Sequence, residues 1–244
     1  MRVQAHQLEK RHSDQFRLRI PAFDIESGTT LGLVGNNGAG KTTFLRLLLD
    51  LIPADAGSIA LNGADASTST DWKPHTGSFL DDSFLMDFLT TDEFFAFIGR
   101  LYGMDASSID AALRPYRDFF TDEPLGQTSR YLRDLSSGNR QKVGLIGAML
   151  IQPKLLVLDE PFANLDPRSQ FQLRALLRRI NREHNTTLIL SSHDLAHVTE
   201  VCERIALIED GEIVRDERTR TSTLSALRQY FTRPARQPAP QHIN

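Results

Sequence analysis

The chain has 244 residues, of which 40% are hydrophobic and 24% are charged, a length that suits one large α/β domain or a domain carrying an inserted lobe. Lys and Arg number 28 against 31 Asp and Glu, a formal net charge of −3. This near-neutral balance argues against nucleic-acid binding, which needs a basic surface. The sequence shows neither a secretory leader nor a run of ~18 apolar residues, so we expect a soluble chain whose single cysteine, Cys202, forms no intramolecular disulfide.

The first third of the sequence predicts short strands and one apolar helix. Residues 16–20 alternate apolar and basic side chains, the period-two pattern of a half-buried strand. Residues 30–34 form a continuous apolar run, which predicts a strand buried on both faces. Residues 44–51 predict a helix so apolar that other elements must cover most of it. A pair of short strands is expected around residues 58–61.

The remaining sequence alternates strands with helices after a helical block. Residues 91–150 predict several helices and no strand. Buried strands are then expected at residues 155–158, 187–191 and 205–208, with an amphipathic helix at residues 167–184. Because strands that alternate with helices pair in parallel, we expect an α/β fold whose mainly parallel sheet is interrupted in sequence by an inserted α-helical subdomain.

A glycine-rich motif follows the buried strand that ends at Val34. Residues 35–42 fit G-x-x-x-x-G-K-[ST] at every fixed position. Its glycines let successive backbone N–H groups point at a phosphate, Lys41 supplies a full positive charge, and Thr42 offers a hydroxyl to Mg²⁺. The motif predicts a nucleoside triphosphate site and by itself leaves kinases, GTPases and ATPases open. The residues expected to bind the nucleotide here are Gly35, Asn36, Asn37, Gly38, Ala39, Gly40, Lys41, Thr42 and Thr43.

Two acids end the strand predicted at residues 155–158. A strand that ends beside the phosphate loop delivers its last side chains to the ligand. Asp159 is therefore expected to hold Mg²⁺ through a water, and Glu160 to orient or deprotonate the attacking water. The sequence contains no Asn-Lys-x-Asp stretch, so guanine specificity of the small-GTPase kind is unsupported.

These motifs together resemble the ATP-binding subunit of an ABC transporter. Residues 35–42 are similar to Walker A, residues 155–159 to Walker B, and residues 135–142 to the signature sequence of that family. Within the last segment Ser136 is a plausible N-cap of a helix expected at residues 143–150, and Gly138 keeps the loop free of a side chain.

Three further segments resemble the same family. Residues 162–167 are similar to its D-loop, residues 191–194 to its switch loop with His193, and residues 57–63 to its hairpin between Walker A and the glutamine loop. The resemblance covers about 230 residues and implies a nucleotide-binding domain over 1–232, with a P-loop NTPase core, an N-terminal antiparallel β subdomain and a helical subdomain at roughly 85–150. The proline-rich tail at 233–244 is expected to be flexible.

The resemblance also implies a mechanism and partners. Two such subunits pack head to tail, as a homodimer or a pseudo-symmetric dimer, and each ATP with its Mg²⁺ lies between Walker A of one copy and the signature of the other. Hydrolysis would drive a separate transmembrane permease, with this chain peripheral at the cytoplasmic face of the membrane. Residues 88–94 and 101–103 resemble exporter subunits, so export is expected. The implied catalytic residues are Glu160, His193 and Lys41, the metal-binding residues Thr42, Asp159 and Asp81, and the signature and D-loop contacts Ser136, Gly138, Asn139 and Asp166.

The sequence departs from the family pattern at several of these positions. The glutamine expected after the strand near residues 76–80 is replaced by Asp81, which could still accept a hydrogen bond from metal-bound water. Ser137 and Asn139 replace a glycine and a glutamine of the signature. His12 is the first candidate for stacking on adenine, and Phe16 the second.

Three other interpretations remain open. His193 and His197 approximate a zinc-binding H-E-x-x-H, although aspartate replaces the glutamate and no third ligand suggests itself. A non-transport ABC ATPase acting on DNA or ribosomes usually has a long coiled coil or two cassettes, and this sequence has neither. A nucleotide-gated assembly module with weak hydrolysis is suggested by Asp81 and by the weak adenine platform.

Overall fold

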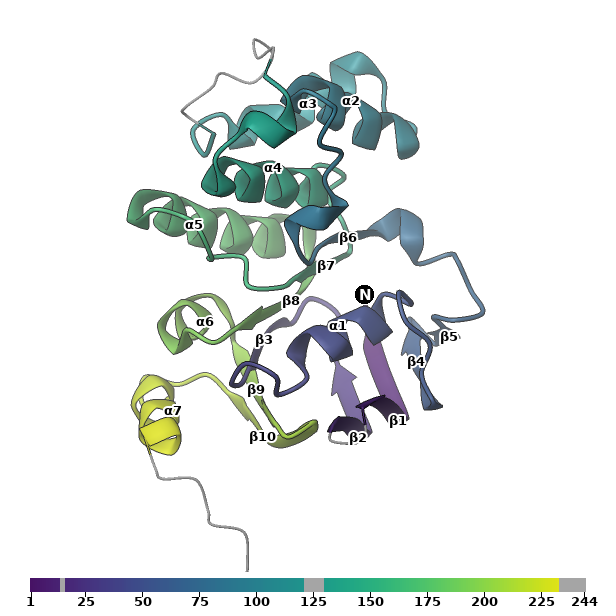
Figure 1. The fold of residues 1–244 in the computed structure, drawn as a ribbon, viewed down its shortest axis with the longest axis vertical. Coiled ribbons are helices and arrows are strands. Elements are labelled where there is room, and N and C mark those ends of the chain that lie inside the picture. The colour runs from purple at the N-terminus through teal and green to yellow at the C-terminus, as the bar shows by residue number, and fades with distance from the viewer. Residues whose placement is uncertain (14–15, 121–129, 233–244) are drawn as a thin grey trace, which may run out of the picture.

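The computed structural model describes residues 1–13, 16–120 and 130–232, and it contains two sheets with helices around them (Figure 1). The predicted flexible tail at 233–244 lies outside the described residues.

The larger sheet has the strand order β10-β9-β3-β8-β7-β6. All neighbours in it pair in parallel except β10, which pairs antiparallel with β9. Its strands are β3 (Thr30–Val34), β6 (Thr76–Phe79), β7 (Leu155–Leu158), β8 (Thr187–Ser192), β9 (Arg204–Glu209) and β10 (Glu212–Arg218). Every residue of β3, β7 and β8 is buried, because helices or the second sheet cover both faces; the continuous apolar runs of these strands follow from that burial.

The smaller sheet is antiparallel, with the order β2-β1-β4-β5. It consists of β1 (Val3–Ser13), β2 (Phe16–Ile25), β4 (Ala56–Leu61) and β5 (Ala64–Asp65). β2 runs five residues past its predicted end, and β1 was not predicted. The alternation of buried residues in β1 breaks at Gln7, whose φ of 46° marks a bulge where the pairing with β4 shifts register, so the period-two signal is lost.

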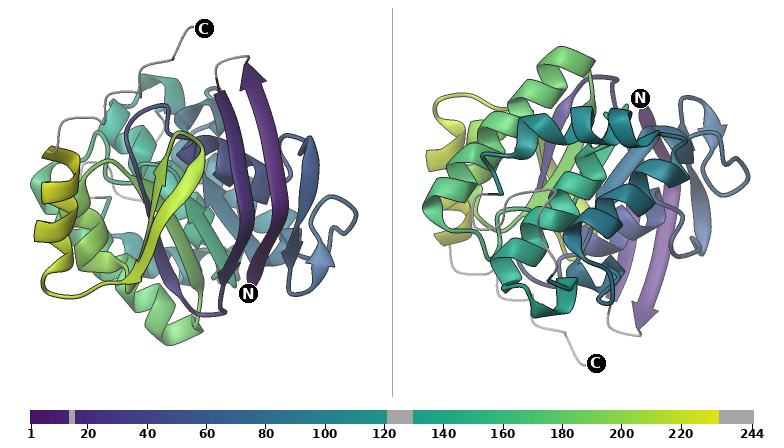
Figure 2. Two further views of the ribbon diagram at one scale, coloured as in Figure 1. Left: turned by 90° about the horizontal axis from the view of Figure 1, so that it is seen from below. Right: turned by 90° about the horizontal axis from the view of Figure 1, so that it is seen from above.

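The helices are α1 (Lys41–Leu48), α2 (Thr91–Leu101), α3 (Ala106–Leu113), α4 (Ser137–Met149), α5 (Pro167–His184), α6 (Leu195–Val201) and α7 (Thr223–Thr232). Short 3-10 turns lie at Lys73–His75, Asp82–Phe84, Arg114–Tyr116 and Leu132–Asp134. α2, α3 and α4 lie together at one end of the molecule, away from β1 and β2 (Figure 1), and face the viewer in the right-hand view of Figure 2.

Alternate residues of the central strands pack into two different hydrophobic clusters. Leu155 and Val157 join α1 and the antiparallel sheet, whereas Leu156 and Leu158 join α4 and α5. This alternation is what a strand covered on both faces requires, since successive side chains point to opposite sides. The central sheet is therefore sandwiched between α1 with the second sheet on one face and α4 with α5 on the other.

Two predicted helices begin earlier in the structure than the apolar pattern indicated. α1 starts at Lys41, three residues before the predicted start, because the loop enters the helix directly from Gly40, whose φ is 111°. α4 starts at Ser137 instead of residue 143, since the side chain of Ser136 caps it there. The signature segment therefore forms the first turn of a helix. In the described part of the chain, no helix is long and apolar enough to cross a membrane.

Candidate active site

The phosphate loop joins the end of β3 to the start of α1. Gly38 and Gly40 have φ values of 81° and 111°, a backbone conformation that residues with side chains rarely adopt. Lys41 Nζ donates hydrogen bonds to the carbonyl oxygens of Gly35 at 2.7 Å and Asn36 at 3.2 Å. A glycine-rich loop that opens a helix is suited to bind an anion, and we call this loop, with the Lys41 ammonium bonded to its carbonyl oxygens, the phosphate cradle.

The ammonium of Lys41 is largely withdrawn from water. Its side chain is 7% exposed, and Nζ lies 3.8 Å from Oε1 of Glu160. Burial lowers the pKa of Lys41 below its ordinary value, although the carboxylates of Glu160 and Asp159 act in the opposite direction. A phosphate group in the cradle would give this ammonium a negatively charged partner, which would offset the loss of solvation.

Asp159 stands at the end of β7 and binds two hydroxyl groups. Its Oδ2 accepts a hydrogen bond from Thr42 Oγ1 at 2.5 Å, and its Oδ1 accepts one from Ser191. A carboxylate and a hydroxyl this close can share one hard cation, because Mg²⁺ prefers oxygen ligands and is usually held by one or two carboxylates plus substrate phosphates. The donor set of Thr42 and Asp159 therefore fits Mg²⁺.

Glu160, the next residue, is fixed by contacts of both its backbone and its side chain. Its backbone N–H donates to Ser191 Oγ at 3.0 Å, its Oε2 lies 2.9 Å from His193 Nδ1, and its backbone adopts a φ of 46°. His193 comes directly after β8, the strand beside β7, which explains how residues 33 positions apart meet. A carboxylate fixed between an imidazole and an ammonium can accept a proton from a water placed next to a phosphate.

These residues open onto a cavity of about 440 Å³. Both adenine candidates lie on it, and Phe16 packs against the phosphate loop, since a Cβ on Gly40 would lie 3.0 Å from Phe16 Cζ. The lining residues are His12, Phe16, Asn37, Gly38, Gly40, Lys41, Thr42, Thr43, Asp159 and Glu160.

The signature residues are not part of that cavity. Ser136 accepts a hydrogen bond from the backbone N–H of Asn139 at 3.3 Å, which caps α4. Gly138 lies against Asn164, because a Cβ on this glycine would come 2.8 Å from the Asn164 carbonyl oxygen. Asp166 caps α5 by accepting from the Ser169 N–H at 3.0 Å. In one copy of the chain the capped start of α4 therefore lies outside the cavity that the phosphate loop lines.

Asp81 is also absent from the cavity lining. It follows β6 and caps the next turn by accepting hydrogen bonds from the N–H and the hydroxyl of Ser83. Its Oδ2 lies 3.8 Å from Arg46 on α1. Its carboxylate therefore has local partners in this structure, and its predicted role as a metal ligand stays a prediction.

The two histidines of the possible zinc motif have separate partners. His193 faces Glu160, whereas the His197 ring stacks on Phe162 with centroids 4.5 Å apart and its Nδ1 lies 3.0 Å from Arg174 Nη1. Among the described residues, no group of three or more His, Cys, Asp and Glu side chains is arranged to hold a metal ion.

Sequence reasoning did not assign two residues that contact the acids. Ser191 joins the Asp159 carboxylate to the Glu160 backbone; it belongs to the segment that resembles the switch loop, but the sequence contains no sign that it contacts the acids. Gln141 Nε2 donates to the carbonyl oxygens of Glu160 at 3.4 Å and Pro161 at 3.3 Å. Gln141 lies within the signature-like segment, but no contact with the acids could be predicted for it from the sequence.

The sequence profile of the ABC transporter family matches residues 18–163. A probable sulfate/thiosulfate import ATP-binding protein of Chlorella vulgaris is 33% identical over 88% of this chain and 90% of its own length. The Nod factor export ATP-binding protein I of Burkholderia lata is 32% identical over 86% of this chain and 68% of its own. An uncharacterised ABC transporter ATP-binding protein of Synechocystis is 33% identical over 81% of this chain, which spans 55% of that relative's length.

Solved structures agree with these sequence relatives in fold. An ATP-binding subunit of an ABC transporter superimposes with a TM-score of 0.79 at 24% identity, over 95% of this chain and 93% of that one. A dimeric ATP-binding cassette in a post-hydrolysis state with ADP and Pi gives a TM-score of 0.76 at 20% identity, over 89% of this chain and 99% of that one. The predicted fold class, with its parallel core, antiparallel N-terminal sheet and inserted helices, is thereby confirmed. The chain belongs to the ABC transporter family, as one of its ATP-binding ATPase cassettes.

Proposed function

We propose that this chain binds and hydrolyses Mg²⁺-ATP and that hydrolysis drives a separate membrane subunit. The observation that carries the proposal is the position of Glu160, whose carboxylate lies 2.9 Å from His193 Nδ1 and 3.8 Å from Lys41 Nζ at the mouth of the phosphate cradle. A bound Mg²⁺, held by Thr42 and Asp159, would supply positive charge to the phosphates.

The residues of the chain divide the chemistry among them. Lys41 and the loop N–H groups neutralise and orient the β- and γ-phosphates, so that the γ-phosphate faces Glu160. Glu160 accepts a proton from the attacking water, and His193 holds that carboxylate in one orientation. His12 and Phe16, which line the same cavity, are the candidates to stack on adenine.

We further propose that a second copy completes the site. Ser136, Gly138 and Asn139 form a capped helix start with no nucleotide cavity of their own. In a dimer these three residues, with Asp166 nearby, would contact the ATP bound to the facing copy. Each nucleotide would then connect the two chains. ATP binding would then favour the closed pair, and loss of the γ-phosphate would weaken it.

The proposed membrane partner has a candidate docking surface. Of the nine large hydrophobic side chains that are exposed in the described residues, five lie between residues 84 and 102: Phe84, Phe88, Phe97, Leu101 and Tyr102. Phe97 and Leu101 are four residues apart on α2 and so share one face of that helix. An exposed apolar surface of this kind is typical of a site that binds another protein. We propose that this protein is a permease, which holds the chain peripherally at the cytoplasmic face of a membrane.

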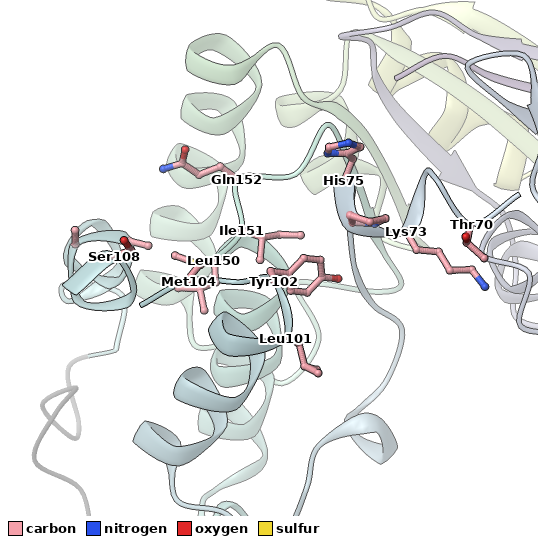
Figure 3. Close-up of a pocket in the computed structure, with 13 residues that line it drawn as sticks. Thr70, Lys73, His75, Leu101, Tyr102, Met104, Ser108, Leu150, Ile151 and Gln152 are labelled. Atoms are coloured by element: carbon pink, nitrogen blue, oxygen red, sulfur yellow. The ribbon is translucent and has the colours of Figure 1, made fainter. Parts of the chain in front are cut away.

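A cavity of about 1090 Å³ adjoins this surface. Its walls come from the end of α2, from α3, from the segment after α4 and from the turn before β6. In Figure 3, Leu150, Ile151 and Tyr102 lie at its centre, with Lys73 and Thr70 to one side and Ser108 to the other. We propose that a segment of the permease enters this cavity.

The direction of transport is proposed to be export. Residues 88–94 and 101–103 resemble exporter subunits, and the Nod factor export protein is among the relatives. Other relatives are named as sulfate/thiosulfate or methionine import proteins. Reconstitution of the chain with its permease in vesicles tests this directly, because ATP supplied on the side of the cassette should move the cargo away from that side.

Phosphate release by the purified chain and its co-purification with a membrane protein test the rest of the proposal. Phosphate release should require Lys41 and should be lost in Lys41→Ala; an ATP-bound dimer that releases no phosphate would favour the nucleotide-gated assembly module instead.

Co-purification with a multispanning membrane protein should be lost in Phe88→Ser. The matched control is Phe171→Ser, which removes an equally exposed phenylalanine, 68% against 64%, from α5.

A further inference from the structure

The guanidinium of Arg140 joins three separate segments of the chain. Arg140 lies in α4, one residue after the signature residue Asn139, and its side chain is 15% exposed. Its Nε donates to Asp82 Oδ2 at 3.1 Å, and its Nη1 donates to Asp87 Oδ1 at 2.6 Å and to the Leu132 carbonyl oxygen at 3.1 Å. Its Nη2 donates to the Asp82 carbonyl oxygen at 3.4 Å.

Both carboxylates belong to one acidic turn, whose first residue, Asp81, is predicted to stand at the family's glutamine position. We call residues 81–87 the acidic turn. Its first residue, Asp81, lies 3.8 Å from Arg46 on α1, and its second, Asp82, binds Arg140 on α4. Adjacent aspartates therefore reach arginines on two different helices, one of which begins at the phosphate cradle and the other at the signature. In the first of these contacts both side chains are exposed to solvent, whereas in the second the arginine is largely buried and only the carboxylate is exposed.

We propose that Arg140 is a positioning residue, which fixes the signature end of α4 to the acidic turn so that the two move as one unit. This inference rests on the proposed function, because the signature matters only where it meets the ATP of a facing copy. A displacement of the acidic turn would carry Ser136, Gly138 and Asn139 toward or away from that ATP.

The geometry requires arginine at this position. Three nitrogens of one planar group reach four oxygens that come from the acidic turn and from Leu132. A lysine ammonium is a point charge on a flexible stem and cannot hold both carboxylates in the same fixed arrangement. Lysine keeps the positive charge but lacks the planar group with several N–H donors. Arg140→Lys therefore separates an effect of charge from the proposed positioning role.

Loss of Arg140 should weaken dimer formation more than it lowers the stability of the folded chain. The side chains of Asp82 and Asp87 are 57% and 59% exposed, so water can solvate them when the guanidinium is removed. The phosphate cradle does not contact Arg140, so the affinity of one copy for ATP should not change. What should change is the free energy of closing two copies on ATP.

The experiment measures that closure in a background that does not hydrolyse ATP. In Glu160→Gln chains with Mg²⁺-ATP, sedimentation equilibrium gives the dissociation constant of the dimer for Arg140→Lys, Arg140→Gln, Asp87→Asn and the double variant Arg140→Gln/Asp87→Asn. We expect both Arg140 variants to raise this constant about tenfold while ATP affinity at low chain concentration is unchanged. Asp87→Asn should add little to Arg140→Gln, because the contact that it weakens is already absent once the guanidinium is gone. Arg133→Gln, an exposed arginine that precedes α4, is the matched control and should behave as the parent.

The outcomes are distinguishable. If the Glu160→Gln parent does not dimerise with ATP, the proposed function fails and this inference fails with it. If the parent dimerises and the Arg140 variants dimerise equally well, the proposed function stands and the positioning role is wrong. Additive effects of Arg140→Gln and Asp87→Asn would also overturn it. Hydrogen exchange provides a check if dimerisation is lost through misfolding: faster exchange confined to residues 82–90 and the first turn of α4 supports the inference, and faster exchange throughout the chain contradicts it.

Discussion

His193 Nδ1 lies 2.9 Å from Glu160 Oε2, and the two residues follow strands that are parallel neighbours in the central sheet. The parallel pairing of β7 with β8 is what delivers an acid and an imidazole from distant parts of the sequence to the same edge of the sheet. In the proposed mechanism this contact holds the carboxylate of Glu160 in one orientation, next to the water that would attack the γ-phosphate.

Glu160→Gln should lower phosphate release by about 10²- to 10⁴-fold, because an amide cannot accept the proton of the attacking water. Affinity for ATP should persist, and the chain should accumulate as an ATP-bound dimer that elutes early in gel filtration. Steady-state turnover equal to that of the unsubstituted chain would defeat the assignment of Glu160.

His193→Ala should reduce turnover by roughly tenfold to hundredfold, the effect of removing one hydrogen bond to a charged group worth about 1.5–3 kcal/mol. The loss should appear in kcat, with little change in KM, because the imidazole contacts Glu160 and not the phosphate cradle. His184→Ala is the control, since His184 ends α5 and is exposed. Equal kinetics for the two variants would mean that the contact between His193 and Glu160 has no part in the reaction.

Ser191→Ala and Ser192→Ala form a matched pair of buried serines on one strand. Ser191 bonds to both acids, whereas Ser192 Oγ accepts from the N–H of Asp194 at 3.0 Å. Removal of Ser191 should destabilise the chain by about 1–3 kcal/mol, measured by urea unfolding. It should also raise the Mg²⁺ concentration that gives half-maximal turnover, because Asp159 loses a group that orients it. The same Mg²⁺ requirement in both variants would refute this role for Ser191.

Alkaline titration should reveal the lowered pKa of Lys41. In the folded chain this lysine binds fewer protons than in the unfolded chain over the window between its lowered pKa and the ordinary value of 10.5, so its contribution to stability rises with pH there. Phosphates favour the ammonium form, so ATP binding in that window should take up a proton and weaken as the pH increases. Calorimetry in two buffers of different ionisation enthalpy measures the uptake, and a value of zero across the window would contradict the prediction.

The parts of the structure that the sequence predicted are those with strong local patterns. The buried strands β3, β7 and β8 are short apolar runs, and the phosphate loop is a fixed spacing of residues, so both could be recognised without knowledge of the fold. β1 was missed because the bulge at Gln7 breaks its alternation. The start of α4 was predicted six residues too late, because the prediction followed the apolar residues. The polar first turn is nevertheless helical, since Ser136 caps it.

The contacts that join the site residues could not be predicted in the same way. Ser191 reaches Asp159 through the pairing of β8 with β7, and Gln141 reaches Glu160 from α4, which packs over the same strands. Such contacts depend on which strands are neighbours and how they are aligned, and a single sequence carries no local signal for either. The partners of Asp81 and Arg140 belong to the same class.

The close approach of Gly138 to Asn164 has a consequence for how two nucleotides would be used. Gly138 belongs to the signature that would serve the other copy, and Asn164 lies four residues after the Glu160 that serves its own. A Cβ on Gly138 would come 2.8 Å from the Asn164 carbonyl oxygen, so the two segments are in direct contact and a shift of either toward the other would push it. The two ATP molecules of a pair would therefore not be consumed independently. We expect a plot of turnover against ATP concentration to be sigmoidal with a Hill coefficient above one, and a hyperbolic plot in Gly138→Ala if the chain still folds, because the added methyl group would force the two segments apart.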